Sequence, residues 1–264
     1  MTVDYRGTTA LITGASSGLG AEFARQLARR GANVVLVARR LDRLTQLAAE
    51  LHEEHGITAT PLEADLVEPG AVDRVVATVT ERGLTISSLV NNAGFGTRGR
   101  FDEEDPARIH EEITLNVTAL VDLTRALLPG LYSAGRGSLI TVASTAAYQP
   151  VPYMAVYGAT KAFVLSFTEA LWVEAQGTGL RVLALSPGAT RTEFFDIAGE
   201  SARVGAFREP RDVVAAALRK LDGRNPGPSM IDGARNRATA ISTRLMRRRG
   251  VAALTGRIMA PDQE

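Results

Sequence analysis

Residues 8–37 read TTALITGASSGLGAEFARQLARRGANVVLV, and this stretch decides the fold. An apolar run, 8–13, leads into a turn with three glycines, after which apolar residues recur at helical spacing as far as Ala28. A second uninterrupted apolar run, 34–37, is typical of a strand buried on both faces. The order strand, glycine turn, helix, strand predicts a βαβ unit with two parallel strands.

The same alternation of apolar runs and helical patterns continues along the chain. It predicts an α/β fold of the Rossmann type, a doubly wound parallel sheet in a single domain with helices on both faces. We expect this domain to span 1–233 and to include a substrate lid at about 193–207. A basic C-terminal extension, 234–264, is expected to be helical and docked. Further strands are expected at 59–62, 88–90, 138–142 and 181–185, and helices at 41–55, 70–82, 106–132 and 155–175.

Composition limits the classes of function open to the chain. The 264 residues carry a net charge of +1, which gives no reason to expect a nucleic-acid partner. There is no cysteine, so disulfides and thiolate sites are excluded, and the three histidines have no further ligand beside them, so no metal site is expected. The N-terminus lacks a signal-peptide pattern, and no apolar run reaches the roughly 18 residues of a membrane span. We expect a soluble cytoplasmic protein.

The glycines of the turn predict a site for a dinucleotide. Gly14 permits the tight turn, Gly18 lets the backbone approach a pyrophosphate, and Gly20 lets the helix pack closely on the strand. The helix that follows directs its N-terminus toward the phosphates. A glycine triplet alone is a weak signal, but its position inside a βαβ unit favours a nicotinamide dinucleotide.

The residues just after the second strand bear on the choice between NAD and NADP. An acidic side chain at this position would bind the adenine ribose hydroxyls of NAD and repel a 2′-phosphate. The chain instead has Ala38, Arg39 and Arg40, and a guanidinium binds phosphate well. We expect NADP, with Arg39 preferred over Arg40 as the contact. The alternative is that both arginines only begin a solvated helix.

Tyr157 and Lys161 are the second signal for chemistry. They stand four residues apart at helical spacing, which places a phenol and an ammonium on one helix face. Lowering a tyrosine pKa from about 10 to about 7 takes roughly 4 kcal/mol, which a unit charge roughly 4 Å away supplies at an effective dielectric of about 20. Tyr157 would then exchange protons at neutral pH. The same pattern is common on exposed helices, so its context has to decide.

With these residues assembled, the chain resembles the classical short-chain dehydrogenase/reductase family from about 8 to 194. The run 13–20 is similar to the family's T-G-x-x-x-G-x-G loop, and the NNAG at 91–94 matches the segment that supports the sheet beside the cofactor. Asp65 and Leu66 resemble the pair that contacts adenine. The chain looks most like the branch that includes long-chain 3-oxoacyl and steroid reductases.

The resemblance implies a role for each catalytic residue. Tyr157 would be the acid/base, and Lys161 would bind the nicotinamide ribose and depress the tyrosine pKa. Ser144 would hydrogen-bond the substrate oxygen, and Asn116 would hold a water in a proton relay with the lysine. The turn at 187–192 would pack against the nicotinamide and bind its carboxamide. The expected cofactor-binding residues are Gly14, Ser16, Ser17, Gly18, Leu19, Gly20, Arg39, Asp65, Leu66, Asn92, Ala93, Gly94, Tyr157, Lys161, Pro187, Gly188 and Thr192.

The implied reaction is hydride transfer between the nicotinamide and a carbon that bears oxygen. In the reducing direction Tyr157 donates a proton to the developing alkoxide while Ser144 stabilises it. Because cells usually keep NADPH reduced, we expect a carbonyl reductase. The segments 95–101, 146–154 and 193–207 are expected to select the substrate, and their aromatic residues favour an apolar pocket. Alternatively, these side chains belong to the core.

Two other functions stay open at this stage. One is a binding protein that senses a dinucleotide without turnover, although intact Ser144, Tyr157 and Lys161 argue against it. The other is membrane association through 234–264, where apolar residues and arginines form a cationic amphipathic pattern. That segment could instead dock on its own subunit or on a neighbour with a solvated arginine face. The family resemblance implies a homodimer or homotetramer.

Overall fold

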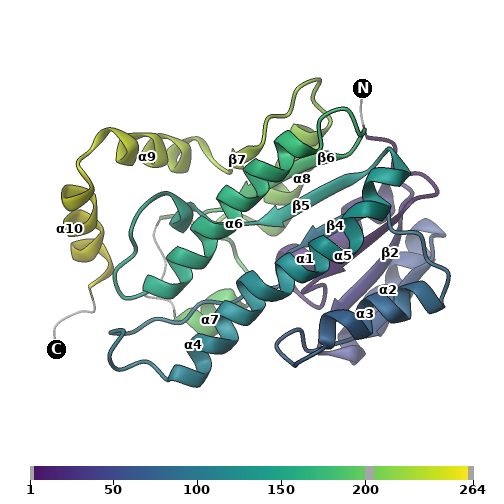
Figure 1. Cartoon of the computed structure of the whole chain (residues 1–264), viewed down its shortest axis with the longest axis horizontal. Coiled ribbons are helices and arrows are strands. Elements are labelled where there is room, and N and C mark those ends of the chain that lie inside the picture. Colours follow the sequence, from purple (N-terminus) through teal and green to yellow (C-terminus); the bar gives the residue numbers. More distant parts are fainter. Residues whose placement is uncertain (1–2, 200–204, 261–264) are drawn as a thin grey trace.

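The computed structural model describes residues 3–199 and 205–260, and Figure 1 shows the course of the chain. Residues 1–2, residues 200–204 of the expected lid and residues 261–264 of the expected extension lie outside the described part. The strands are β1 (Thr9–Thr13), β2 (Asn33–Ala38), β3 (Ala59–Glu63), β4 (Ser88–Asn91), β5 (Ser138–Val142), β6 (Arg181–Ser186) and β7 (Ser229–Ile231). The helices are α1 (Gly18–Arg29), α2 (Leu41–His55), α3 (Ala71–Glu81), α4 (Pro106–Ile113), α5 (Ala119–Ala134), α6 (Ala155–Glu174), α7 (Phe194–Ala198), α8 (Pro210–Leu221), α9 (Ala234–Leu245) and α10 (Arg248–Met259).

The strands form one parallel sheet in the order β3-β2-β1-β4-β5-β6-β7. The order reverses direction between β1 and β4, so the connections that leave these neighbouring strands diverge. In open α/β sheets ligands bind outside the carboxyl ends of the strands at such a point. The predicted fold class, a doubly wound Rossmann-type sheet, is confirmed.

Helices cover both faces of the sheet (Figure 1), and each face has its own apolar core. Successive residues of a strand point to opposite faces, so Ile12 enters one core and its neighbour Leu11 the other, both with no exposed surface. This is why the strands read as continuous apolar runs rather than as alternating patterns. Helices α1, α2 and α8 supply Leu27, Leu44 and Leu218 to the first core, and α3, α5 and α6 supply Val75, Leu123 and Leu171 to the second.

The expected single helix over 106–132 is interrupted. A π-helical turn, Thr114–Thr118, separates α4 from α5, and Asn116 is buried in it. The Asn116 side chain bonds both main-chain groups of Phe95: Oδ1 accepts the N–H at 3.1 Å and Nδ2 donates to the carbonyl at 2.8 Å. Apolar periodicity does not report this distortion, because π-helical turns mark local side-chain demands and are frequent at functional sites.

The apolar spacing predicts no element between 186 and 233, where the structure has α7, α8 and β7. Pro210 begins α8 in its first turn, where a missing N–H breaks no helical hydrogen bond. Strand β7 is three residues long, too short for a periodic signal, and it pairs parallel to β6 at the edge of the sheet. A short strand is recognisable only once its neighbour is in place.

The C-terminal segment forms two helices rather than one. Helices α9 and α10 are separated at Met246 and Arg247, whose backbones are extended. Figure 1 shows both helices beyond the end of α6, away from the body of the sheet. No helix in residues 3–199 or 205–260 combines the length and the apolar character needed to cross a membrane.

Gly137, which directly precedes β5, tests how much the close packing against Ser87 contributes to stability. Its φ is +103°, and a Cβ there would lie 2.0 Å from Ser87 O. We expect Gly137→Ala to lower the free energy of unfolding by about 3 kcal/mol or more, because left-handed strain of about 1–2 kcal/mol adds to the clash. Urea unfolding measures the change.

Gly83→Ala is the matched control. Gly83 has a φ of +63° with nothing within 4 Å of the added Cβ, so only the backbone strain applies. Its cost should stay near 1 kcal/mol. Equal losses for the two variants would show that the close approach of Gly137 to Ser87 contributes nothing to stability.

Candidate active site

A cavity of about 1040 Å³ lies at the carboxyl edge of the sheet. Its walls come from the turns that follow β1 to β7 and from the helices α4, α6, α9 and α10. Among the expected site residues, Gly20 and Asn116 do not line it; both lie directly behind lining residues. Those that line it are Gly14, Ser16, Ser17, Gly18, Leu19, Arg39, Asp65, Leu66, Asn92, Ala93, Gly94, Ser144, Tyr157, Lys161, Pro187, Gly188 and Thr192.

Thr13 and Asn92 fasten together the carboxyl ends of β1 and β4. Thr13 Oγ1 accepts the N–H groups of Asn92 and Ala93, each at 3.0 Å. In return, Asn92 Nδ2 donates to Thr13 O at 2.9 Å and to Gly14 O at 3.3 Å. The glycine turn is therefore held by the neighbouring strand.

Gly20 lies behind that turn, where a Cβ would be 2.2 Å from Gly14 O, so only glycine lets α1 start this close to β1. Ser17 precedes α1, and its side chain makes no capping hydrogen bond. The Ala21 N–H donates to Ser17 O at 3.2 Å, and the N–H groups of residues 18–20 have no partner within the helix. With the positive end of the helix dipole, these donors fit the pyrophosphate of a dinucleotide.

Arg40 contacts the glycine turn directly. Its guanidinium donates to Ser16 Oγ at 2.9 Å, to Ser17 Oγ at 3.1 Å and to Glu193 Oε2 at 2.8 Å. Arg43 pairs with the same carboxylate. The hydrogen bond from Arg40, assisted by those from Arg43 and Ser17, lowers the pKa of Glu193 to about 2. Glu193 thus links the first residues of the expected lid to the start of α2 by a carboxylate that stays ionised.

Arg39, the expected contact of a 2′-phosphate, has different surroundings. Its side chain is 67% exposed, and its ion pair with Asp65 spans 3.9 Å. Both Arg39 and Arg40 line the cavity. Sequence reasoning preferred Arg39 and did not foresee the hydrogen bonds of Arg40, because they depend on the folded shape of the turn.

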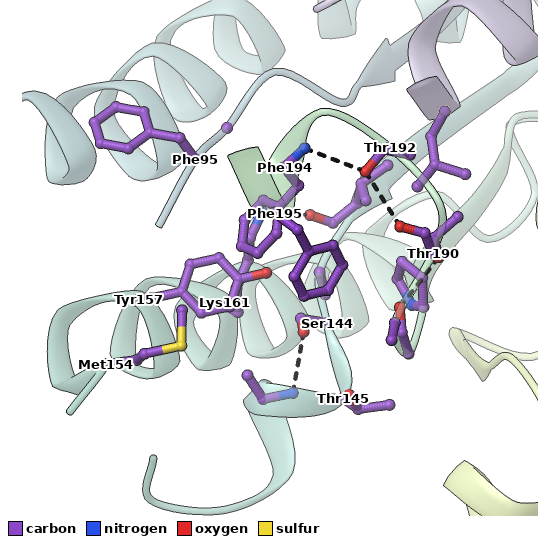
Figure 2. A pocket seen from close by; sticks show the side chains of 18 of the residues that line it. Phe95, Ser144, Thr145, Met154, Tyr157, Lys161, Thr190, Thr192, Phe194 and Phe195 are labelled. Carbon is purple, nitrogen blue, oxygen red and sulfur yellow. Dashed lines mark hydrogen bonds between the residues drawn. The ribbon is translucent and has the colours of Figure 1, made fainter. Parts of the chain in front are cut away.

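Tyr157, Lys161 and Ser144 converge on one side of the cavity (Figure 2). Lys161 Nζ lies 5.8 Å from the centre of the Tyr157 ring. Lys161 is buried and donates to Val142 O at 2.9 Å. Ser144 follows β5, and its Oγ accepts the Ala146 N–H at 3.1 Å, which leaves the hydroxyl hydrogen to bond another group.

The expected low pKa of Tyr157 is not found. Burial raises the pKa of the Tyr157 phenol to about 12, and hydrogen bonding with Ser144 offsets only part of that rise. Burial also lowers the pKa of Lys161 to about 8. The expectation was wrong because spacing along a helix reveals the attraction between a phenolate and an ammonium but not the loss of hydration that both charges suffer.

Asn116 fixes the loop after β4 from behind. A Cβ at Gly94 would lie 2.7 Å from Asn116 Oδ1 and 3.3 Å from Lys161 Nζ. A Cβ at Gly96 would lie 2.7 Å from a ring carbon of Tyr157. The backbone of this loop therefore runs directly against the amide, the ammonium and the phenol, where no side chain would fit.

The turn after β6 closes the cavity opposite the glycine turn. A Cβ at Gly18 would lie 2.9 Å from Thr192 Cγ2, so the two turns meet. A Cβ at Gly188 would lie 2.3 Å from Asn236 Nδ2, so α9 packs against the same turn. Pro187 lines the cavity beside them. The glycine turn, the loop after β4 and the turn after β6, which are all expected to bind one cofactor, thus surround one cavity.

Aromatic rings from the described part of the expected lid cover Tyr157. The Phe194 ring centre lies 5.3 Å from that of Tyr157, with the planes tilted by 47° (Figure 2). Phe195 packs edge-on against Phe194 at 5.3 Å and against Phe207 at 5.1 Å. This row of rings limits the access of water to the phenol.

Helices α9 and α10 supply a wall of the cavity that sequence reasoning missed. Met246, Leu254 and Ile258 line it, and buried Met259 packs with Val151 and Met154. The apolar residues of the segment do recur at helical spacing. Spacing reveals that such helices have an apolar face but not what the face covers, and here part of it faces the cavity.

The site combines a glycine turn, an uncapped helix N-terminus and a serine, tyrosine and lysine set along one sheet edge. Residues 8–202 match the family described as short chain dehydrogenase. The chain belongs to the short-chain dehydrogenase family.

Relatives and a solved structure agree with this match. Over 186 residues the dehydrogenase is 40% identical to sulfoacetaldehyde reductase 2 of Chromohalobacter salexigens, covering 70% of this chain and 73% of that protein. Over 226 residues it is 35% identical to a very-long-chain 3-oxoacyl-CoA reductase of Phaeosphaeria nodorum, covering 84% of this chain and 65% of that protein. A short-chain dehydrogenase from Sphingobium yanoikuyae in complex with NADPH is similar with a TM-score of 0.80 at 38% identity, covering 93% of this chain and 95% of that one.

This short-chain dehydrogenase is therefore an oxidoreductase of carbonyl and alcohol groups that uses a nicotinamide dinucleotide. The predicted family and enzyme class are confirmed. The predicted likeness to a reductase branch with long-chain 3-oxoacyl substrates is confirmed as well.

The two lysines of the dehydrogenase, Lys161 and Lys220, allow a direct test of its electrostatics. Because burial lowers the pKa of Lys161 to about 8, one ¹³C-lysine NMR signal should titrate near pH 8 and vanish in Lys161→Met. An unfolded lysine titrates near 10.4 and so holds its proton longer. The free energy of unfolding, relative to Lys161→Met, should rise between about pH 8 and pH 10. A Lys161 signal that titrates near pH 10.4 would contradict the burial of its charge.

Proposed function

We propose that this dehydrogenase is an NADP(H)-dependent reductase that converts the carbonyl group of a lipophilic substrate into a secondary alcohol. The convergence of Ser144, Tyr157 and Lys161 on the cavity that also contains the glycine turn carries the proposal. One space thus joins groups that suit a dinucleotide to groups that suit proton transfer.

Tyr157 acts as the general acid in this proposal. With a pKa of about 12, the phenol keeps its proton at neutral pH. An alkoxide is about as basic as hydroxide, whose conjugate acid has a pKa of about 15.7, so the proton passes downhill from Tyr157 to a reduced substrate. The raised pKa therefore keeps the proton available on Tyr157 at the pH at which a carbonyl group would be reduced.

The neighbouring side chains hold the substrate oxygen and the proton donor in place. Ser144 donates its hydroxyl hydrogen to the substrate oxygen, and its Oγ can still accept the Ala146 N–H at the same time. The bound nicotinamide supplies the hydride. Lys161 binds the nicotinamide ribose from its position beside Tyr157. Asn116 acts from behind by fixing the loop after β4.

The cofactor lies along the carboxyl edge in this proposal. The N–H groups at the start of α1 that have no partner within the helix bind the pyrophosphate, Asp65 and Leu66 contact the adenine, and the turn 187–192 binds the carboxamide. The charge of Arg40 is paired with Glu193 at 2.8 Å, whereas among the described residues Arg39 has only the 3.9 Å pair with Asp65. The charge of Arg39 is thus the more available one, which supports it as the contact of the 2′-phosphate of NADP.

An apolar substrate is supported by the cavity wall beside Tyr157. Val151, Met154 and Met259 form a buried apolar cluster against which Tyr157 and Phe194 pack. These side chains come from the expected selecting segments and from α10. Burial of each methylene group of a substrate in such a wall contributes about 0.8 kcal/mol.

The lining role of α9 and α10 supports substrate binding as the purpose of the C-terminal segment. Membrane association through its exposed arginines and apolar side chains stays an alternative prediction, and so does dinucleotide sensing without turnover. The division of the chain at 233, the cytoplasmic location and the homo-oligomeric state also stay predictions.

The cofactor proposal predicts a charge-dependent preference. NADPH should bind more tightly than NADH. Arg39→Ala should weaken the binding of NADPH by about 10- to 100-fold and leave the binding of NADH nearly unchanged, because a charge-assisted hydrogen bond contributes about 1.5–3 kcal/mol. Isothermal titration calorimetry with each dinucleotide measures this.

Arg82→Ala serves as the control, because Arg82 is exposed at the end of α3 and does not line the cavity. It should change neither dissociation constant. If NADPH and NADH bind equally and Arg39→Ala alters neither, Arg39 is only a surface charge and the NADP assignment fails.

The catalytic proposal predicts that Tyr157→Phe lowers kcat by about 10²- to 10⁴-fold with NADPH affinity retained, because a general acid contributes that much. A homologous series of methyl ketones and 3-oxoacyl thioesters supplies the substrates, and absorbance of NADPH measures turnover. For the wild type, kcat/KM should rise by up to about 4-fold for each added methylene.

Tyr153→Phe is the matched control, because Tyr153 lies near the same apolar cluster but outside the cavity lining. It should keep most of the activity. Turnover of Tyr157→Phe at the wild-type rate would contradict the assignment of the general acid, and a wild type that binds NADPH but reduces none of these ketones would favour dinucleotide sensing.

A further inference from the structure

Glu112 is a buried acid that the proposed mechanism does not use. It lies on α4, one helical turn before Asn116, and no part of it is exposed. Its Oε1 atom is buried without a hydrogen-bond partner in the part of the chain that the structure describes. A carboxyl group in this position costs free energy unless it holds a proton or serves a purpose.

The other carboxyl oxygen of Glu112, Oε2, hydrogen-bonds to the loop after β4. Glu112 Oε2 lies 2.9 Å from the Thr97 N–H nitrogen and 2.8 Å from Thr97 Oγ1. Thr97 follows directly on Gly96, whose backbone runs against the ring of Tyr157. Glu112 therefore lies one loop away from the proposed general acid.

A second carboxyl group reaches the same hydroxyl from the solvent side. Glu104, which is half-buried, has its Oε2 atom 2.9 Å from Thr97 Oγ1. A threonine hydroxyl has one hydrogen, so it can donate to only one of the two carboxyl oxygens. The carboxyl group that does not receive this hydrogen must then carry a proton of its own to bond the threonine oxygen. The arrangement thus holds a proton shared among Glu104, Thr97 and Glu112.

Burial favours Glu112 as the holder of that proton. It raises the pKa of Glu112, and the charge of Glu104 raises it further, while hydrogen bonds from Thr97 and the charge of Lys161 oppose the rise. On α6, Tyr157 and Lys161 both feel the charge of Glu112. Glu112 thus shares the Thr97 hydroxyl with a half-buried carboxyl group, and its charge acts on the proposed site of proton donation.

We propose that Glu104, Thr97 and Glu112 form a proton-transfer path that resupplies the Tyr157–Lys161 pair from solvent. The inference rests on the proposed reductase function. These residues do not touch the substrate; they act through Tyr157.

The proton balance of the path is simple. In each reduction Tyr157 loses one proton to the substrate oxygen, and the Tyr157–Lys161 pair regains one from Glu112. Glu112 takes a proton from the Thr97 hydroxyl, which takes one from Glu104, and Glu104 takes one from solvent. No electrons move along the path, and its residues return to their starting state.

The variants Glu112→Gln and Thr97→Val keep the shape of each side chain but interrupt the path. With the best substrate of the ketone and thioester series, each should lower kcat by about 10-fold or more and enlarge the solvent deuterium isotope effect, because proton resupply becomes limiting. The loss should steepen as the pH rises and protons become scarce. The dissociation constant of NADPH should stay within about 2-fold of the wild type.

Glu103→Gln is the control, because Glu103 is exposed in the same loop and pairs only with Arg100 among the described residues. It should leave the rate, the isotope effect and the pH profile unchanged. Unchanged rates and isotope effects in Thr97→Val would overturn the path, because Thr97→Val keeps the main-chain N–H that a merely structural role of Glu112 requires.

Infrared spectroscopy provides a readout that does not depend on turnover. At neutral pH the wild type should have a carbonyl band of a buried protonated carboxyl group, and Glu112→Gln should lack it. Glu104→Gln should shift the titration of this band to lower pH, since the negative charge beside Glu112 is removed. Absence of the band from the wild type at neutral pH would overturn the shared proton. If the band behaves as expected but no carbonyl compound is reduced, the proposed reductase function fails and the proton pair stands.

Discussion

The hydrogen bonds between Thr13 and Asn92 are the interaction on which the site depends. They join β1 and β4 where the strand order reverses, so the two connections that leave these strands start from one fixed point. The first becomes the glycine turn and α1. The second becomes the loop that Asn116 and Glu112 hold from behind and that runs against Tyr157. The proposed phosphate-binding donors and the proposed proton-transfer groups thereby share one frame, which catalysis by positioning requires.

Burial then decides the chemistry of that frame. It raises the pKa of Tyr157 to about 12, lowers that of Lys161 to about 8, and raises that of Glu112. Each shift favours the neutral form, so the site tends to keep a proton on the phenol and on the buried carboxyl group. These groups therefore hold their protons more tightly than they would in water. The lid residue Phe194 strengthens this tendency by covering the phenol.

Much of the fold could be predicted because its signals are local. The apolar run at 138–142 is the strand β5 itself, and 41–55 is the helix α2 itself. The elements that the sequence did not predict were missed for a common reason. The π-helical turn around Asn116 exists because its side chain bonds Phe95, and β7 exists because β6 offers it an edge. Both depend on partners distant in the sequence, and periodicity contains no information about them.

The sequence by itself determined the order of strands as far as β6, the glycine turn before α1, and the spacing of Tyr157 and Lys161, because backbone geometry and helical pitch act over a few residues. Tertiary structure alone decided the rest. It brought Met259 against Met154 in the wall of the cavity, and it placed Arg40 on the glycine turn. It also raised the pKa of Tyr157 where the sequence suggested a fall. The physical reason is desolvation, which depends on everything that surrounds a group and on little that adjoins it in the chain.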